Sequence, residues 1–322
     1  MDFFDILTLA GGLALFLFGM RYMGEKLEKH TGKRLEPLLE RFTESKFKGF
    51  LTGTAGAALM QSSSAVTVMV VGFVDSGLIS LHNATGVIIG SNVGTTFTAW
   101  ILSLSGVEGG AFLTDLFKPS SLAPIAAVAG IFLFSGKKSA KKDLGGVILG
   151  FSVLMTGLNI MAASASGIKN EPWAMEMLTL FSNPVLGIIA GALLTAAVQS
   201  SSASVGILQT LSLTGGISYY SCIPIILGQN IGTCVTTLLA GLGASQNARR
   251  AALIHLYFNT FSAAIFYALF IIIQKFTDIP RIFEPADAVG IAAVHTAFNV
   301  FSAAIMLPMS DFLEKSAIKS VA

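Results

Sequence analysis

Charged residues are scarce in this sequence of 322 residues. Asp, Glu, Lys and Arg make up 12% of it, against roughly 25% in an ordinary soluble domain. Between positions 177 and 248 none of the four occurs, although one membrane-spanning helix needs only ~20 residues. This scarcity excludes a soluble globular protein. It predicts an all-α integral membrane protein whose chain enters the lipid bilayer more than once in this region.

Other features are missing as well, and each excludes something. The net charge is only +2, with no basic stripe between aromatic residues, so we expect no nucleic-acid partner. The two cysteines, Cys222 and Cys234, lie in apolar surroundings without metal-site spacing, and we expect buried thiols. No cleavage site follows the first apolar segment, which predicts a retained helix. No Arg or Lys lies inside an apolar span, so an anionic ligand would need helix N-termini and accompanying cations.

Apolar windows separated by charged residues predict the membrane spans. About seven are long enough to cross the bilayer: 3–20, 82–104, 119–135, 144–166, 219–242, 251–274 and 287–309. Two further apolar pieces, 46–78 and 184–216, each carry the sequence QSSS in the middle. Each piece could be a kinked span or a re-entrant hairpin.

The positively charged residues distinguish these alternatives. If both pieces are hairpins and the N-terminus is outside, sixteen of the 20 Lys and Arg residues lie on the cytoplasmic side. Lys118, Lys169, Lys275 and Arg281 then lie outside, which is the asymmetry that the positive-inside rule requires. The sequence therefore predicts two hairpins and a multi-pass protein of the cell (inner or plasma) membrane, with an outside N-terminus and a cytoplasmic C-terminus.

A shift of 138 residues places the second half of the chain on the first without a gap. QSSSA at 61–65 meets QSSSA at 199–203, and Gly-x-Asn-x-Gly-Thr at 90–95 meets the same pattern at 228–233. Three crossings separate the first helices of the two halves, so we predict inverted-topology repeats, as in secondary transporters. Repeat 1 (1–142) holds the first helix, an amphipathic segment, hairpin 46–78, span 82–104 and connecting span 119–135. Repeat 2 (143–242) holds hairpin 184–216 and span 219–242, two helices complete 243–322, and we expect each repeat to contain a broken or kinked span.

The QSSS motifs place polar side chains deep in the membrane. From Lys48 to Gln61 the helix rises roughly 20 Å, close to the middle of a hydrocarbon core about 30 Å thick. Serine is a good N-cap, so each tip can begin a half-helix whose N-terminus attracts an anion. The Gln and hydroxyl oxygens suit sodium. The alternative is a hydroxyl seam between helices, which the duplication in register disfavours.

Two further motifs are repeated. GSNVGTTFT from Gly90 and GQNIGTCVT from Gly228 place Asn and Thr between glycines, either as ligands or for close helix packing. HLYFNTFSAAI from His255 and HTAFNVFSAAI from His295 place His, Asn and Ser on one helix face. This stripe is either an interhelical polar contact or a relay for protons or cations.

Together, the paired QSSS, Gly-x-Asn-x-Gly-Thr and HLYFN/HTAFN motifs resemble the sodium-phosphate cotransporter family, which contains the animal type II cotransporters and bacterial relatives. The resemblance covers about Leu13 to Pro308. It implies a secondary active transporter rather than an enzyme. Inorganic phosphate would be imported with sodium ions by alternating access, without an organic cofactor. Many bacterial relatives add a PhoU-like domain after the last span, and no such segment is found here.

The resemblance also implies the site residues. The phosphate site would comprise Gln61, Ser62, Ser63, Ser64, Gln199, Ser200, Ser201, Ser202, Asn92 and Asn230. The sodium sites would comprise Gln61, Ser64, Thr95, Thr96, Gln199, Ser202 and Thr233. Cys234 stands where the family usually has a second Thr.

Other functions were weighed. A phosphate-responsive membrane sensor or scaffold without transport is the main alternative, because the amphipathic segment 21–48 offers a surface to a partner. An intramembrane serine hydrolase is disfavoured, since no single serine sits on a Gly-flanked turn. The sequence leaves open the anion (phosphate, sulfate or arsenate), the sodium stoichiometry and the oligomeric state, a homodimer included.

Overall fold

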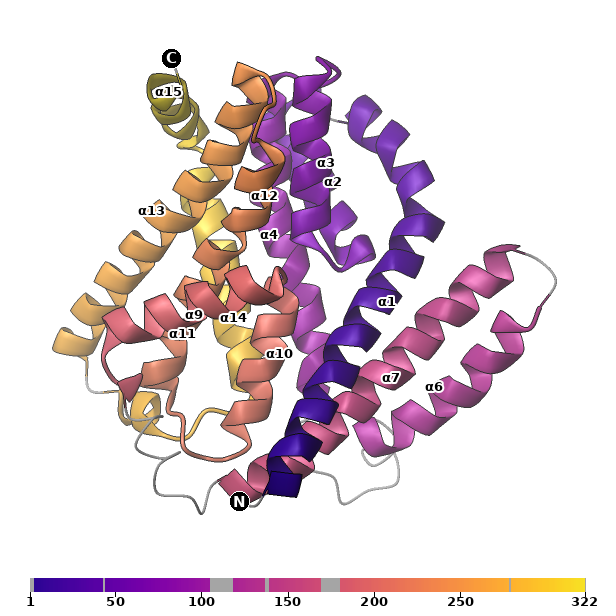
Figure 1. The fold of residues 1–322 in the computed structure, drawn as a ribbon. Coiled ribbons are helices and arrows are strands. Elements are labelled where there is room, and N and C mark those ends of the chain that lie inside the picture. Colours follow the sequence, from indigo (N-terminus) through magenta and orange to yellow (C-terminus); the bar gives the residue numbers. More distant parts are fainter. Residues whose placement is uncertain are drawn as a thin grey trace.

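The computed structural model describes residues 3–42, 44–104, 118–136, 139–168, 180–277 and 279–321. Within these ranges the chain is helical and contains no β-strand, and its two ends lie at opposite ends of the molecule (Figure 1). The helices of the first half are α1 (Phe3–Phe42), α2 (Lys46–Met60), α3 (Ser63–Asp75), α4 (Leu81–Ser103), α6 (Pro119–Phe134) and α7 (Ser139–Ile168). Those of the second half are α9 (Pro184–Val198), α10 (Ser201–Ser212), α11 (Tyr219–Gly232), α12 (Cys234–Ala240), α13 (Gln246–Phe276), η2 (Pro280–Phe283), α14 (Ala288–Met306) and α15 (Ser310–Ser320).

Five stretches of helix in the described residues are long and apolar enough to cross a membrane. They are Phe4–Lys29, Ser139–Ser164, Tyr219–Ala240, Gln246–Phe276 and Ala288–Met306. These stretches confirm a helical membrane protein with several spans. Their number in the described residues is five, whereas about seven spans were predicted. The predicted span 82–104 is helix α4, whose apolar residues alternate with many polar ones. The predicted span 119–135 is α6, which has 16 residues and a length of about 24 Å.

Helix α1 differs from its sequence prediction, because it continues without a break beyond residue 20 to Phe42. The segment after residue 20 is rich in Glu, Lys, Leu and Arg, which are strong helix formers. The apolar part of α1 packs along α7, with Phe16, Leu154 and Leu158 in the shared core. The apolar residues of α1 and the charged residues from Arg21 onwards therefore belong to one continuous helix.

Helices α2 and α4 pack closely, and so do α9 and α11. A Cβ atom at Gly90 would collide with the carbonyl oxygen of Phe50, and one at Gly228 would collide with that of Ile188. The same 138-residue shift relates the two pairs. Close packing, the structural alternative for the glycine motifs, is therefore confirmed in both copies.

Of the two spans that follow the QSSS pieces, only the second has the predicted break, and the prediction is wrong for the first. Helix α11 ends at Gly232 and α12 begins at Cys234, whereas α4 is continuous over the corresponding residues.

Candidate functional site

The two QSSS motifs adopt the same local backbone. Helix α2 ends at Gln61 (φ 53°, ψ 29°) and α9 ends at Gln199 (φ 58°, ψ 24°). Among the described non-glycine residues, only these two have positive φ. Ser62 and Ser200 are then extended, and their hydroxyls accept hydrogen bonds from the N–H groups of Ala65 (3.1 Å) and Ala203 (3.2 Å). The predicted break and serine N-cap are confirmed in both copies.

One cavity, of about 660 Å³, is lined by both breaks. Gln61 and Ser62 contribute to its wall, as do Gln199 and Ser200. Helices α3 and α10 begin immediately after these residues, and the first N–H groups of a helix lack partners within it. The Oε1 atom of Gln61 is buried without a hydrogen-bond partner. Two helix N-termini and free polar side chains around one cavity are suited to bind a small oxyanion.

The other members of the QSSS motifs lie behind this wall. Ser63, Ser201 and Ser202 are buried and do not line the cavity. Ser64 lines a neighbouring cavity of about 500 Å³, together with Thr236 and Glu28. The structure therefore divides the predicted set into residues at the cavity surface and residues that support them.

The five predicted ligands of the second motif, Asn92, Thr95, Thr96, Asn230 and Thr233, line neither of these two cavities. All are buried, and each donates a hydrogen bond to a backbone carbonyl of the preceding turn of its own helix: Asn92 to Ile88 (2.9 Å), Thr95 to Ser91 (3.1 Å), Thr96 to Val93 (2.8 Å), Asn230 to Ile226 (2.9 Å) and Thr233 to Gln229 (3.0 Å). In this structure their donors are used within the helix.

Sequence reasoning missed three charged residues of the cavity wall. Arg21, Glu25 and Glu28 on α1 line the cavity together with the two breaks. Arg21 Nε lies 3.0 Å from Glu25 Oε1, and the two side chains are 83% and 59% exposed. Their spacing of four and three residues places them on one helix face. The spacing is visible in the sequence. The three residues were not predicted to belong to the site because they follow the predicted span 3–20, and only residues inside the apolar segments were considered as ligands.

The histidine motifs differ in their partners. His255 Nδ1 lies 3.0 Å from Thr237 Oγ1, which lies 3.1 Å from Thr67 Oγ1. This buried Thr67–Thr237–His255 seam joins α3, α12 and α13. His295 on α14 is equally buried, but neither of its ring nitrogens has a hydrogen-bond partner within the described part of the chain.

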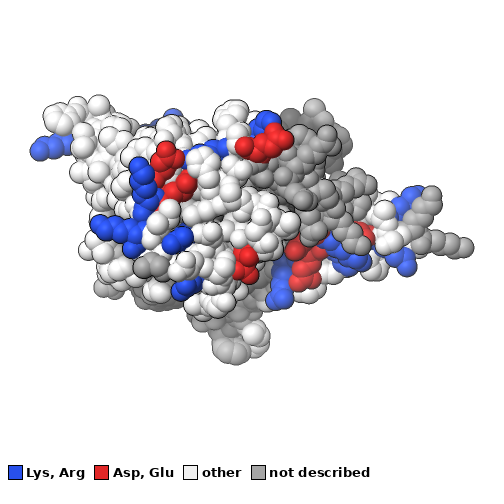
Figure 2. Space-filling model, turned by 90° about the horizontal axis from the view of Figure 1, so that it is seen from above, with Lys and Arg blue, Asp and Glu red and all other residues white. Residues whose placement is uncertain are grey.

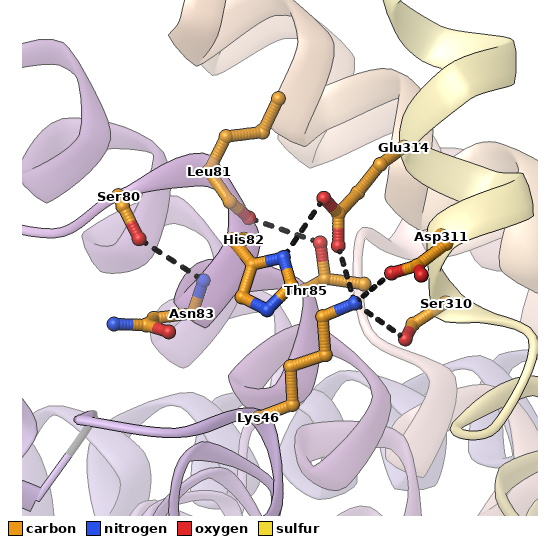
Figure 3. Close-up of polar contacts among 9 residues, drawn as sticks. All are labelled: Lys46, Ser80, Leu81, His82, Asn83, Thr85, Ser310, Asp311 and Glu314. Atoms are coloured by element: carbon orange, nitrogen blue, oxygen red, sulfur yellow. Dashed lines mark hydrogen bonds and ion pairs between the residues drawn. The ribbon is translucent and has the colours of Figure 1, made fainter.

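A charged cluster lies at the end of the molecule that carries the C-terminus. On this face, basic and acidic side chains lie next to one another (Figure 2). Lys46 Nζ forms ion pairs with Asp311 and with Glu314 (3.0 Å) and donates to Ser310 Oγ (2.9 Å), as Figure 3 shows. His82 Nδ1 lies 3.2 Å from Glu314 Oε2. The Lys46 ammonium already pairs with both carboxylates, so we interpret the cluster as an anchor of α15 on α2 and α4 rather than a metal site.

This anchor should make stability depend on pH. The hydrogen bond from Lys46 lowers the pKa of Asp311 below its usual value, so Asp311 stabilises the fold above the unfolded pKa of about 3.9. As the pH falls through that value towards the folded pKa, the contribution is lost. We expect Asp311→Asn to lower the thermal unfolding midpoint at pH 7, with the difference shrinking as the pH falls below about 4 and vanishing below the folded pKa. In a Lys46→Met background, Asp311→Asn should change little; an equal change would contradict the anchor.

Comparison with known proteins decides the family. The model of the Na+/Pi-cotransporter family matches residues 15–163 and 171–302. The chain belongs to the Na+/Pi-cotransporter family. The family is one of transporters, with phosphate and sodium as the transported species, and its match includes both QSSS motifs and the cavity-lining part of α1.

Among the relatives of this family member, the uncharacterized protein YqeW of Bacillus subtilis is 28% identical over 256 residues, which are 79% of this chain and 78% of YqeW. YjbB of Escherichia coli K12, named as a candidate inorganic phosphate export protein, is 28% identical over 262 residues, 81% of this chain and 46% of YjbB. The sodium-dependent phosphate transport protein 2A of Rattus norvegicus is 41% identical over 96 residues, 28% of this chain and 15% of that protein. This family member thus spans less than half of YjbB. No solved structure matches it.

Proposed function

We propose that this protein is a sodium-coupled symporter that imports inorganic phosphate by alternating access. One observation carries the proposal: Gln61, Ser62, Gln199 and Ser200, from breaks 138 residues apart, line a single cavity. The family membership supports phosphate and sodium as the transported species. The two QSSS tips would form the binding site near the middle of the membrane.

In this proposal α2–α3 and α9–α10 are re-entrant hairpins in two repeats of inverted topology. Helix α2 has 15 residues and a length of about 22 Å, so a helix that starts at the membrane surface ends near mid-membrane. Several basic residues belong to helix ends on the side of the molecule that carries the C-terminus (Figure 1): Lys48, Arg249, Lys315 and Lys319. By the positive-inside rule, that side of the molecule would be the cytoplasmic one. Of the charges used in the topology prediction, Lys137, Lys138 and Lys169 lie outside the described residues.

The chemistry of the tips suits both transported species. The N-termini of α3 and α10, with the serine hydroxyls of the motifs, would bind the phosphate oxygens. The side-chain oxygens of Gln61 and Gln199 would accept sodium, which prefers oxygen ligands. Bound sodium offsets the charge of the anion and lowers the cost of taking it out of water. Alternating access would open the cavity towards one side of the membrane at a time.

The members of the predicted set that do not line the larger cavity also have roles in this proposal. Asn92 and Asn230 would join the phosphate site, and Ser64, Thr95, Thr96, Ser202 and Thr233 the sodium sites, in another state of the transport cycle. In this structure the side-chain donors of the two Asn and three Thr residues are used within helices. A change of helix geometry would be needed to free them.

The direction of transport follows from the gradients. The relative YjbB is named for export, whereas a symporter driven by an inward sodium gradient imports its anion. We expect proteoliposomes with high external sodium to accumulate radiolabelled phosphate, and equal replacement of sodium by choline to abolish the accumulation. Sulfate competes weakly if the site is selective for phosphate. Unchanged uptake in choline would refute sodium coupling, and phosphate binding without flux would favour the sensor.

A further inference from the structure

The cavity wall is charged on one side only. Arg21, Glu25 and Glu28 line it from α1, and the 138-residue shift places Asn159, Ala163 and Ser166 at the corresponding positions of α7. Neither Asn159 nor Ala163 lines the cavity. The charged part of the cavity wall is therefore found in one half of the chain only and is not part of the 138-residue repeat.

Arg21 is placed to meet an anion that enters the cavity. Its side chain is 83% exposed in the protein, and it shares the wall with Gln61 and Gln199. A guanidinium group binds phosphate oxygens in a bidentate manner and is charged at every physiological pH. Within the described residues it is the only Arg or Lys on this wall.

The ion pair with Glu25 does not prevent this role. Arg21 Nε and Glu25 Oε1 lie 3.0 Å apart, and both side chains are more than half exposed. Exposed ion pairs of this kind are weak, so an entering phosphate can replace the carboxylate at little cost. Glu25 then competes with phosphate for the Arg21 guanidinium. When no phosphate is bound, Glu25 keeps that guanidinium oriented.

We propose that Arg21 is a substrate-binding residue at the cavity entrance, whose guanidinium exchanges Glu25 for the phosphate oxyanion. This inference rests on the proposed function and adds a specific cation to a cavity whose other lining residues are neutral or, at Glu25 and Glu28, acidic. It assigns to Glu25 the role of an internal competitor.

The test is phosphate uptake by reconstituted wild-type and variant proteins at a fixed inward sodium gradient. We expect Arg21→Gln to raise KM for phosphate about tenfold with the maximal rate within twofold, because one charge-assisted contact is lost. Arg21→Lys keeps the charge without the bidentate geometry and should raise KM about threefold. Glu25→Gln removes the competitor and should lower KM.

Lys26 provides the matched control. It has the same charge on the same helix, its ammonium lies 5.2 Å from the Tyr22 ring centroid, and it does not line the cavity. We expect Lys26→Gln to leave KM unchanged. An Arg21→Gln protein with KM within twofold of wild type, or a Lys26→Gln protein with the same rise, would overturn the inference. If Arg21→Gln fails to fold, the other two variants provide the test. A higher KM for Arg21→Lys and a lower KM for Glu25→Gln support the inference, and an unchanged KM in both overturns it.

The failure of the proposed function would look different. Wild-type protein without sodium-dependent uptake would refute the symporter. Equilibrium dialysis with radiolabelled phosphate then tests Arg21 separately, because weaker binding by Arg21→Gln than by Lys26→Gln supports its role and equal binding overturns it.

Discussion

Sodium-dependent phosphate uptake by the Gln61→Met protein is expected to fall by one to two orders of magnitude. Gln61 lines the shared cavity, and its buried Oε1 atom has no hydrogen-bond partner in the protein. Methionine keeps the length and the unbranched Cβ that the left-handed backbone at φ 53° requires. It removes both polar atoms, and a hydrogen bond to a charged group contributes about 1.5–3 kcal/mol. Since about 1.4 kcal/mol corresponds to a factor of ten, the loss in uptake follows.

The measurement compares initial uptake rates in proteoliposomes that contain equal amounts of folded protein. Gln199→Met should lose a similar factor, because Gln199 has nearly the same backbone geometry and lines the same cavity. Gln274→Met is the matched control, since Gln274 lies near the end of α13 and lines neither cavity. Uptake by Gln61→Met within twofold of the control would contradict a ligand role for this side chain.

Gly90→Ala should destabilise the protein by about 3 kcal/mol, the upper end for an overpacked core. The added methyl group would collide with the Phe50 carbonyl, and backbone cannot turn aside as a flexible side chain can. Because α2 and α4 pack along this contact, the helices must separate. We expect a clear fall in the midpoint of thermal unfolding in detergent, and a similar fall for Gly228→Ala at the Ile188 carbonyl.

Gly72→Ala is the control for helix propensity. Gly72 is also inside a helix, but a Cβ atom there would meet nothing within 4 Å. Alanine is favoured over glycine in a helix by about 0.8–1.0 kcal/mol, so Gly72→Ala should be neutral or stabilising. Equal unfolding midpoints for Gly90→Ala and Gly72→Ala would show that the contact between α2 and α4 yields without cost.

The helix breaks could be predicted from the sequence because their causes are local. Four polar residues in an apolar run, with a serine suited to cap the next helix, determine where α2 ends and α3 begins. The repetition of the motif indicated a common role for Gln61 and Gln199, although only the three-dimensional structure shows that they line the same cavity.

The contribution of α1 could not be predicted in the same way. Arg21 belongs to the cavity because α1 stays helical past its apolar part and packs along α7, and both are matters of tertiary structure. The same holds for Asn92 and Asn230, since their residue type suits a ligand but their donors bond to the helix backbone. Five of the seven predicted spans meet the length and hydropathy of a crossing in the described residues, and a hydropathy window does not distinguish the shorter α6 from a full crossing.

The Thr67–Thr237–His255 seam makes the two halves of the molecule energetically unequal. The 138-residue shift places Val205 at the position of Thr67 and Ala99 at that of Thr237, and these apolar residues cannot form the two hydrogen bonds. At about 0.5–1.5 kcal/mol each, the bonds add about 1–3 kcal/mol to whichever state keeps α3 against α12 and α13. A motion that separates these helices would therefore start from a resting population biased about 5- to 150-fold towards that state. In the alternating access proposed above, this one polar seam would give the protein a preferred resting conformation without any ligand bound.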